Sequence, residues 1–161
     1  MRRLLLATTN PGKLTEIRAL LGSLPLDVED PLSLGIDIAV EEEGETYAAN
    51  ARAKALAYAK STQLWVLADD SGLEVDALGG APGPRSHRLA GPCRSDADRR
   101  RMLLSLLETQ PPPWTARFRC AVALAGPTGT LDVAEGDCPG QVIAGERGTG
   151  GFGYDPIFLV A

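Results

Sequence analysis

The hydrophobic positions of this chain alternate between short apolar runs and residues repeated at helical spacing, a pattern that predicts an α/β fold. The apolar runs predict strands over residues 3–8, 64–68, 115–125, 130–137 and 154–160, with one short strand within 27–39 and another at 141–144. Helical segments alternate with the first strands, and the last strands follow one another directly. This order predicts an α/β domain with a mixed β-sheet.

Three helices are predicted from spacing and from their end signals. Asn10 and Pro11 are favoured at a helix start, and Gly22 is a plausible stop. The apolar positions of this first helix are Leu14, Ile17, Leu20, Leu21 and Leu24. An alanine-rich helix is expected over 45–60. A third begins at Ser95 or Asp96, with Met102, Leu103, Leu106 and Leu107 expected on its inner face.

Length and charge narrow the class of protein. A chain of 161 residues is expected to form one domain, residues 1–161. Its net charge of −5 argues against a general binder of nucleic acid polymers or membrane surfaces. No apolar run reaches the roughly 20 residues that span a bilayer. The three cysteines are far apart and odd in number, which favours free thiols in a reducing cytoplasm.

The strand at residues 64–68 is followed by Asp69, Asp70, Ser71 and Gly72. Side chains alternate along a strand, so the two carboxylates are expected to face opposite ways. One of them can then point into a cleft at the carboxyl end of the strand, where it can bind a divalent cation or activate water. The alternative is an ordinary turn, which this segment taken alone favours.

A second candidate segment joins the first strand to the first helix. A helix N-terminus presents backbone N–H groups and a positive dipole end to a phosphate. The residues of this segment are Thr8, Thr9, Asn10, Pro11, Gly12 and Lys13. The spacing of a Walker loop is absent. A plain capped turn with a solvated lysine is an equally good interpretation of this motif alone.

An acidic cluster, Glu41 to Glu43, precedes the second helix, on which Asn50 and Lys54 share a face. Acidic residues ahead of a helix can simply favour its positive dipole end. Alternatively, Glu41 or Glu42 supplies a second oxygen ligand to a Mg²⁺ ion held mainly by Asp70.

A glycine-rich loop, residues 148–156, contains the letters of a dinucleotide-binding motif but is followed by Pro156 rather than by a helix. We therefore reject that function. Phe152, Gly153, Tyr154 and Asp155 instead suit a nucleobase slot, with an aromatic face for stacking and backbone groups that approach closely. The alternative is a surface loop anchored by two aromatic side chains.

In this order, and over nearly the whole chain, these segments resemble the inosine triphosphate pyrophosphatase family. The resemblance implies an elongated mixed β-sheet flanked by helices, in two lobes with the active site in a central cleft, and usually a homodimer. It also implies Mg²⁺-dependent hydrolysis of non-standard purine nucleoside triphosphates (ITP, dITP, XTP) to the monophosphate and pyrophosphate.

The resemblance also implies roles for individual residues. Residues 8–13 and Lys54 would bind phosphates, Ser71 would contact the substrate, and residues 152–155 would line the base pocket. Asp70 would be the general base and a metal ligand, with Glu41 as the second ligand.

The sequence departs from the family pattern at Ala49, in the segment 84–89 and at its end. Family members continue beyond the position of Ala161 with a lysine and a Ser-His-Arg motif. We therefore expect the domain to be C-terminally incomplete and its catalysis impaired. A nucleotide-binding protein without turnover and a dTTP or UTP pyrophosphatase of the related group are the alternative functions.

Overall fold

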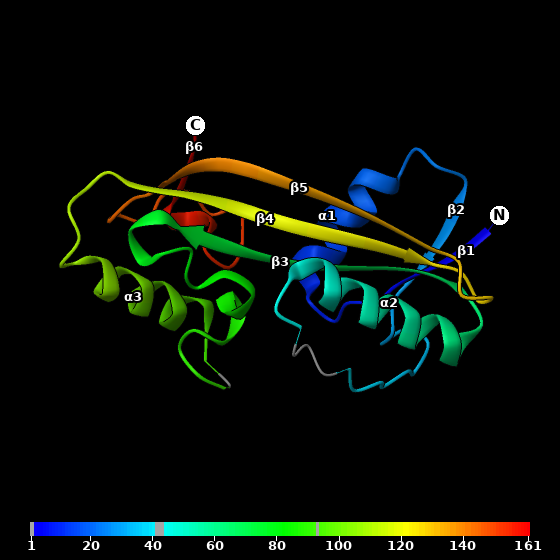
Figure 1. The fold of residues 1–161 in the computed structure, drawn as a ribbon. Helices are drawn as coiled ribbons and strands as arrows, with labels where there is room; N and C mark the ends of the chain where they lie inside the picture. The colour runs from blue at the N-terminus through cyan, green and yellow to red at the C-terminus, as the bar shows by residue number, and fades with distance from the viewer. Residues whose placement is uncertain (1, 41–43, 93) are drawn as a thin grey trace. The chain divides into compact units, whose positions relative to one another are not determined.

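The computed structural model describes residues 2–40, 44–92 and 94–161, and it forms a six-stranded sheet with the strand order β2-β1-β3-β4-β5-β6 (Figure 1). The strands are β1 (Arg2–Leu6), β2 (Leu26–Glu29), β3 (Trp65–Val75), β4 (Trp114–Ala125), β5 (Leu131–Val142) and β6 (Phe158–Val160). The α-helices are α1 (Pro11–Leu21), α2 (Tyr47–Thr62) and α3 (Asp96–Leu107). Three short 3₁₀ helices are η1 (Asp76–Leu78), η2 (Gly83–Arg88) and η3 (Asp155–Ile157).

The sheet is mixed, as the element order predicts. β1 pairs in parallel with both β2 and β3, whereas β5 pairs antiparallel with β6. β4 and β5 form the expected hairpin, closed by the hydrogen bond from the Gly126 N–H to the Thr130 carbonyl (2.7 Å). The predicted α/β class with helices flanking a mixed sheet is confirmed.

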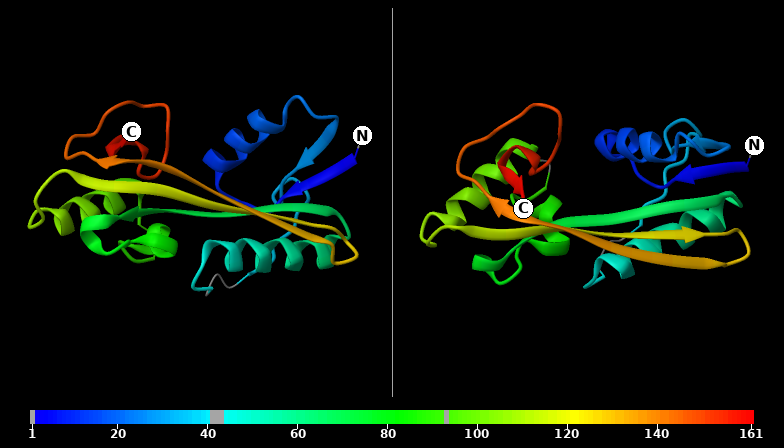
Figure 2. Two further views of the ribbon diagram at one scale, coloured as in Figure 1. Left: turned by 45° about the horizontal axis from the view of Figure 1, so that its top comes forward. Right: turned by 90° about the horizontal axis from the view of Figure 1, so that it is seen from above.

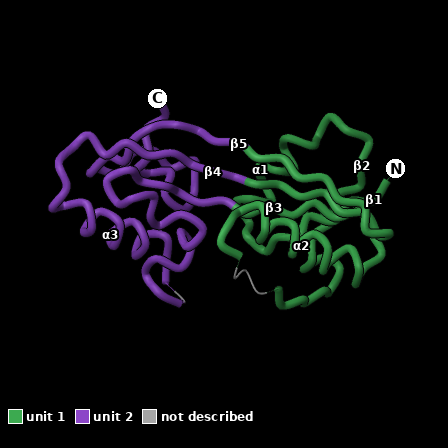
Figure 3. Tube along the Cα trace, viewed as in Figure 1, with its two compact units in different colours: residues 1–70, 121–135 green, residues 71–120, 136–161 purple. Residues whose placement is uncertain are grey.

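The described chain divides into two compact units (Figure 3). The first contains residues 1–70 and 121–135, and the second contains residues 71–120 and 136–161. Strands β3, β4 and β5 contribute residues to both units. Asp70 is therefore the last residue of one unit and Ser71 the first of the other.

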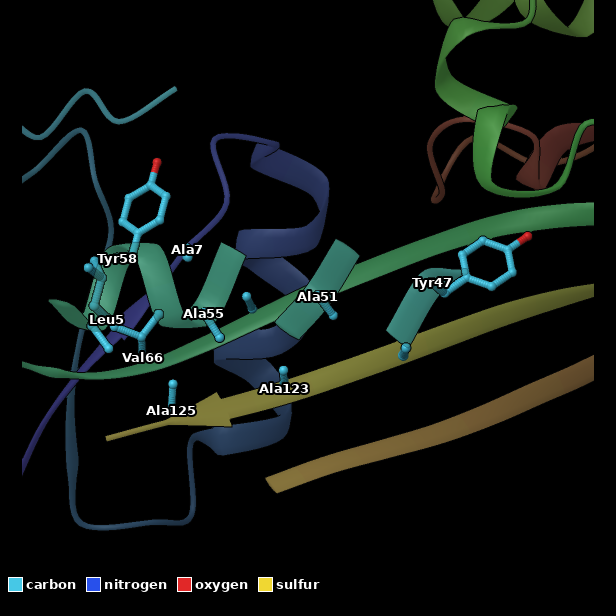
Figure 4. Close-up of a cluster of buried hydrophobic side chains, with 12 residues drawn as sticks. Leu5, Ala7, Tyr47, Ala51, Ala55, Tyr58, Val66, Ala123 and Ala125 are labelled. Carbon is cyan, nitrogen blue, oxygen red and sulfur yellow. The ribbon is translucent and has the colours of Figure 1, made fainter. Parts of the chain in front are cut away.

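In the first unit, α1 and α2 lie on opposite faces of the strands (Figure 2). The core lies beneath α2, whose small residues Ala51 and Ala55 are fully buried and point at the strands (Figure 4). They meet Val66 of β3 and Ala123 of β4, which are also fully buried. Alanine on both surfaces lets a helix approach a sheet closely, and this closeness brings the polar side chains of α2 within reach of β3.

The core of the second unit is built from Leu73 and Val75 of β3, Leu103 and Leu107 of α3, and Ile157, all with no exposed surface. α3 begins as predicted. The Ser95 side chain accepts from the Asp98 N–H and the Asp98 carboxylate accepts from the Ser95 N–H, which forms a complete capping box.

Three local predictions are wrong. β3 continues through the two aspartates to Val75, because Leu73 and Val75 are buried and extend the apolar alternation beyond the polar residues. The segment is therefore not a turn. On α3, Met102 and Leu106 are 43% and 42% exposed, since only the stripe through Leu103 and Leu107 faces the core.

The apolar stripe of α1 is also narrower than expected. Leu20 is 80% exposed, and none of the residues of α1 is buried. Leu14, Ile17 and Leu21 follow the spacing of one helix face and are half-buried, whereas Leu20 lies off that face. Within the described residues, no helix is both long and apolar enough to cross a membrane.

Candidate active site

Consecutive residues of β3 direct two buried carboxylates to the two different helices of the first unit. Asp69 pairs with Lys13 of α1, and Asp70 accepts a hydrogen bond from Asn50 of α2. Because α1 and α2 lie on opposite faces of the sheet, the prediction that the two aspartates face opposite ways is confirmed. Both side chains are buried, with Asp69 at 5% and Asp70 at 7% exposure.

Asp69 is held by two lysines. Lys13 Nζ lies 2.6 Å from Asp69 Oδ2, and Lys54 Nζ donates to the Asp69 carbonyl oxygen at 3.0 Å. The other carboxylate oxygen, Oδ1, is buried and has no hydrogen-bond partner among the residues that the structure describes. A buried, unpartnered carboxylate oxygen is unfavourable unless something else binds it. Asp69 therefore offers one free oxygen beside two ammonium groups.

Asp70 is positioned by an amide. Asn50 Nδ2 donates to Asp70 Oδ2 at 2.8 Å, and the Gly44 N–H donates to Asn50 Oδ1, also at 2.8 Å. A Cβ at Gly44 would lie 2.5 Å from that oxygen, so this close approach requires glycine. Asn50 thus connects Asp70 to the first described residue after the acidic cluster. The predicted ligand Glu41 and its alternative Glu42 lie outside the described residues.

The start of α1 differs from the sequence expectation of free backbone donors. Asn10 Oδ1 accepts from the Gly12 and Lys13 N–H groups at 2.9 and 3.2 Å, and Thr8 Oγ1 accepts from the Asn10 N–H at 3.2 Å. The capping role predicted for Asn10 is confirmed. Because Asn10 Oδ1 already binds those two amides, an anion at this turn has to compete with the cap for them.

Residues 152–155, which we call the aromatic loop, belong to the second unit. Asp155 Oδ2 accepts from the Phe152 N–H (2.9 Å), and the Tyr154 hydroxyl donates to the Ser86 carbonyl (2.6 Å). Phe152 is half-buried and Asp155 exposed, whereas Tyr154 is buried. Burial raises the pKa of Tyr154 to about 12, so its hydroxyl remains a donor at physiological pH.

The site residues predicted from the sequence thus lie in both units. Thr8 to Lys13, Lys54 and Asp70 belong to the first, and their charged groups converge on residues 69 and 70. Ser71 and Phe152 to Asp155 belong to the second. That these groups share one cleft stays a prediction.

The donor chemistry fits a hard divalent cation. Among the described residues, no group of three or more histidine, cysteine, aspartate or glutamate side chains could hold a metal by itself. Mg²⁺ does not require such a group, because it binds through one or two carboxylates together with substrate phosphates and water. The carboxylate of Asp70 is a donor of that kind, whereas Asp69 faces α1 on the opposite side of the sheet.

Sequence reasoning missed the roles of Asn50 and Asp69. The spacing of Asn50 and Lys54 placed both on one helix face, and that face does contact β3. The partner of each side chain, however, depends on how α2 docks on the sheet, and sequence spacing does not give this. Asp96 and Arg100, which bind the aromatic loop, were also missed.

Comparison with known proteins places this geometry in a family. The chain matches the model of the Ham1 family over residues 4–161 and belongs to that family. A protein named dITP/XTP pyrophosphatase from Gloeobacter violaceus is 51% identical over 160 residues, which cover 99% of this chain and 78% of the relative. One of the same name from Desulforamulus reducens is 49% identical, covering 98% of this chain and 79% of the relative.

Solved structures agree. A HAM1 protein from Coxiella burnetii superposes with a TM-score of 0.86 at 38% identity, covering 98% of this chain and 81% of that one. The predicted resemblance is confirmed by these matches.

Proposed function

We propose that this protein hydrolyses non-standard purine nucleoside triphosphates (ITP, dITP and XTP) to the monophosphate and pyrophosphate. One observation carries the proposal. In a chain 51% identical to a dITP/XTP pyrophosphatase, a buried carboxylate, Asp70, is held by Asn50 one residue from an aspartate paired with Lys13. A general base and an ammonium cluster that meet on one strand suit attack of water on a phosphate.

The triphosphate binds to the first unit. Lys13 and Lys54 supply positive charge in a protein of net charge −5. Residues 8–12 form the turn, which supplies the hydroxyl groups of Thr8 and Thr9 and the side-chain N–H groups of Asn10. Asn10 has a second task, since its capping bonds hold the turn in place. Pro11 fixes the direction in which α1 leaves the turn.

The purine binds to residues 152–155, where the half-buried ring of Phe152 offers a stacking surface. Tyr154 anchors the loop through its hydroxyl bond to Ser86, and Asp155 holds the Phe152 amide. Ser71, which directly follows the general base Asp70 in the sequence, contacts the substrate.

Asp70 orients and deprotonates the attacking water. Because Asn50 donates to one carboxylate oxygen, Oδ2, the rotamer of Asp70 is set before substrate binds. Asp70 and Glu41 would hold Mg²⁺ through one carboxylate oxygen or more each. When bound, the cation would neutralise phosphate charge and stabilise the pyrophosphate leaving group.

A substrate panel tests the proposal. ITP, dITP, XTP, GTP, ATP, dTTP and UTP are incubated with the protein and Mg²⁺, and pyrophosphate release is measured. Release from ITP, dITP and XTP well above the rest supports the proposal. Preference for dTTP or UTP points to the related pyrimidine group, and nucleotide binding without release points to a protein that lacks turnover. Release that does not require Mg²⁺ after treatment with EDTA contradicts the metal assignment.

Three further properties belong to the same proposal. Residues 1–161 act as one nucleoside triphosphate pyrophosphatase domain, the protein is a homodimer, and it works in the cytoplasm, where the nucleotide pool is. Light scattering coupled to size-exclusion chromatography distinguishes a dimer from a 17.0 kDa monomer.

A further inference from the structure

α3 binds the loop of residues 152–155 at one residue, Gly153. The Gly153 N–H donates to Asp96 Oδ2 at 3.0 Å, and Arg100 Nη1 donates to the Gly153 carbonyl at 2.8 Å. Both backbone polar groups of one loop residue are thus bound by two side chains that lie four positions apart on a single helix face. Gly153 has a φ of +59°, a conformation that favours glycine.

The two gripping side chains are themselves held in place. Asp96 Oδ1 pairs with Arg99 Nη1 at 2.6 Å, while Arg99 Nε donates to the His87 carbonyl at 2.7 Å. Arg100 Nε pairs with Glu146 Oε1 at 2.7 Å, and the Arg100 side chain is only 12% exposed. Because their rotamers are fixed, Asp96 and Arg100 position the loop rather than follow it.

The next residue is fixed from another element. The Tyr154 hydroxyl reaches the Ser86 carbonyl, and Ser86 Oγ donates to the Gly83 carbonyl at 2.6 Å. Ser86 Oγ also accepts from the Leu73 N–H at 2.9 Å. Gly153 and Tyr154 are therefore held from α3 and η2, whereas residues 145–151 are exposed. The backbone that sets the Phe152 ring is thus held by α3 through Gly153 and by Asp155 through the Phe152 N–H.

We propose that Asp96 and Arg100 are positioning residues that determine purine selectivity by holding the Gly153 peptide beside Phe152. The inference rests on the proposed function, in which residues 152–155 receive the base. Asp96 and Arg100 act through the backbone of Gly153. Their loss therefore weakens recognition of the base and leaves recognition of the phosphates unchanged, since the phosphate-binding residues belong to the first unit.

The alternative is a purely structural clasp that stabilises the second unit. One face of α3 carries Asp96, Arg100, Leu103 and Leu107. The two leucines of this face belong to the core of the second unit. A clasp of that kind would lower the melting temperature and reduce all activities together. Selectivity separates the two roles, because a stability defect does not distinguish a ligand with a base from one without it.

The test compares Arg100→Ala with Arg101→Ala in the full chain. Arg101 is the next residue of α3, pairs with Asp98 and is 73% exposed, so it is a matched loss of one arginine. Calorimetry measures binding of IMP, which carries a base, and of pyrophosphate, which does not. Loss of a charge-assisted bond to the loop predicts about tenfold weaker IMP binding in Arg100→Ala, with pyrophosphate binding unchanged.

Steady-state kinetics give the second measurement. The ratio of kcat/KM for ITP to that for UTP should fall about tenfold in Arg100→Ala and stay at the wild-type value in Arg101→Ala. Arg100→Lys, which keeps one donor for the Gly153 carbonyl, should recover part of the ratio. Asp96→Ala, which removes the acceptor of the Gly153 N–H, covers the case in which Arg100→Ala fails to fold, and the ITP to UTP ratio should again fall.

Equal loss of IMP and pyrophosphate binding, or an unchanged ITP to UTP ratio in a folded Arg100 variant, overturns the inference. Failure of the proposed function looks different, because then the wild-type protein itself shows no preference for ITP. If Arg100→Ala binds IMP as tightly as wild type does while wild type still prefers ITP, only the inference about Asp96 and Arg100 is wrong.

Discussion

Asn50 and Asp70 are joined by a 2.8 Å hydrogen bond from Nδ2 to Oδ2, across the interface between α2 and β3. The orientation of the amide is set by its other end, because Oδ1 of Asn50 accepts from the Gly44 N–H. The buried side chain of Asn50 therefore fixes both the carboxylate of Asp70 and the backbone of Gly44, the residue after the acidic cluster. This arrangement makes Asp70 the residue to test first.

Asp70→Asn should abolish pyrophosphate release from ITP while nucleotide binding is largely retained. The amide has the size of the carboxylate but cannot accept a proton from water. Turnover and calorimetric binding of ITP are the two measurements. A variant that keeps wild-type turnover would show that Asp70 is not the base.

Asn50→Ala should lower kcat about 10- to 100-fold, the usual effect of removing a residue that orients a catalytic carboxylate. KM for ITP should change little, because the lysines that bind phosphate stay in place. Arg52→Ala, an exposed change on the same helix, is the control. A rise of KM of that same size, with kcat unchanged, would mean that Asn50 contributes to binding of ITP and not to catalysis.

Hydrolysis in ¹⁸O-water should place the label in the monophosphate, because water activated by Asp70 attacks the α-phosphorus. Mass spectrometry of the two products decides the matter. Label found only in pyrophosphate would reject attack at the α-phosphorus while leaving the substrate class untouched.

Leu103→Ala should lower the free energy of unfolding by about 2–5 kcal/mol, because it leaves a cavity at a position with no exposed surface. Leu106→Ala, three positions along the same helix and 42% exposed, should change stability by less than about 1 kcal/mol. Urea titrations of both variants make the comparison. Similar losses would show that the core stripe of α3 has been assigned to the wrong face.

Asp98→Asn should destabilise the protein at neutral pH but not at very low pH. Bonds from the Ser95 hydroxyl and backbone N–H, together with Arg101, lower the pKa of Asp98 from its ordinary value of 3.8 to about 2. A lowered pKa in the folded state means that the carboxylate contributes stability above pH 3.8, and that this contribution is lost as the pH falls through about 2. Melting temperatures of wild type and variant should therefore converge in acid. A constant difference across this window would exclude titration of Asp98 as the cause.

The sequence predicts most of the fold because its local signals agree with one another. Asn10 and Ser95 cap the helices that they were expected to cap, and the hairpin lies around residues 126–129. The errors come from packing. Asp69 and Asp70 look like a turn until Leu73 and Val75 are known to be buried, and burial is a property of the assembled core.

The candidate site was predictable in its residue types but not in its connections. Lys13 was expected to be a mobile charge, yet it is paired with Asp69, 56 positions away in the sequence. The contact depends on the parallel pairing of β1 with β3, which brings the start of α1 close to Asp69. The grip of Arg100 on Gly153 is likewise a contact between elements, which spacing within one element does not reveal.

The pairing of Lys13 with Asp69 also affects which anions can bind to Lys13. An anion gains the lysine only by displacing an internal carboxylate, so it has to bring a higher charge density than that carboxylate supplies. A polyphosphate satisfies this condition and chloride does not. Chloride at physiological concentration therefore does not saturate Lys13 before a nucleotide binds.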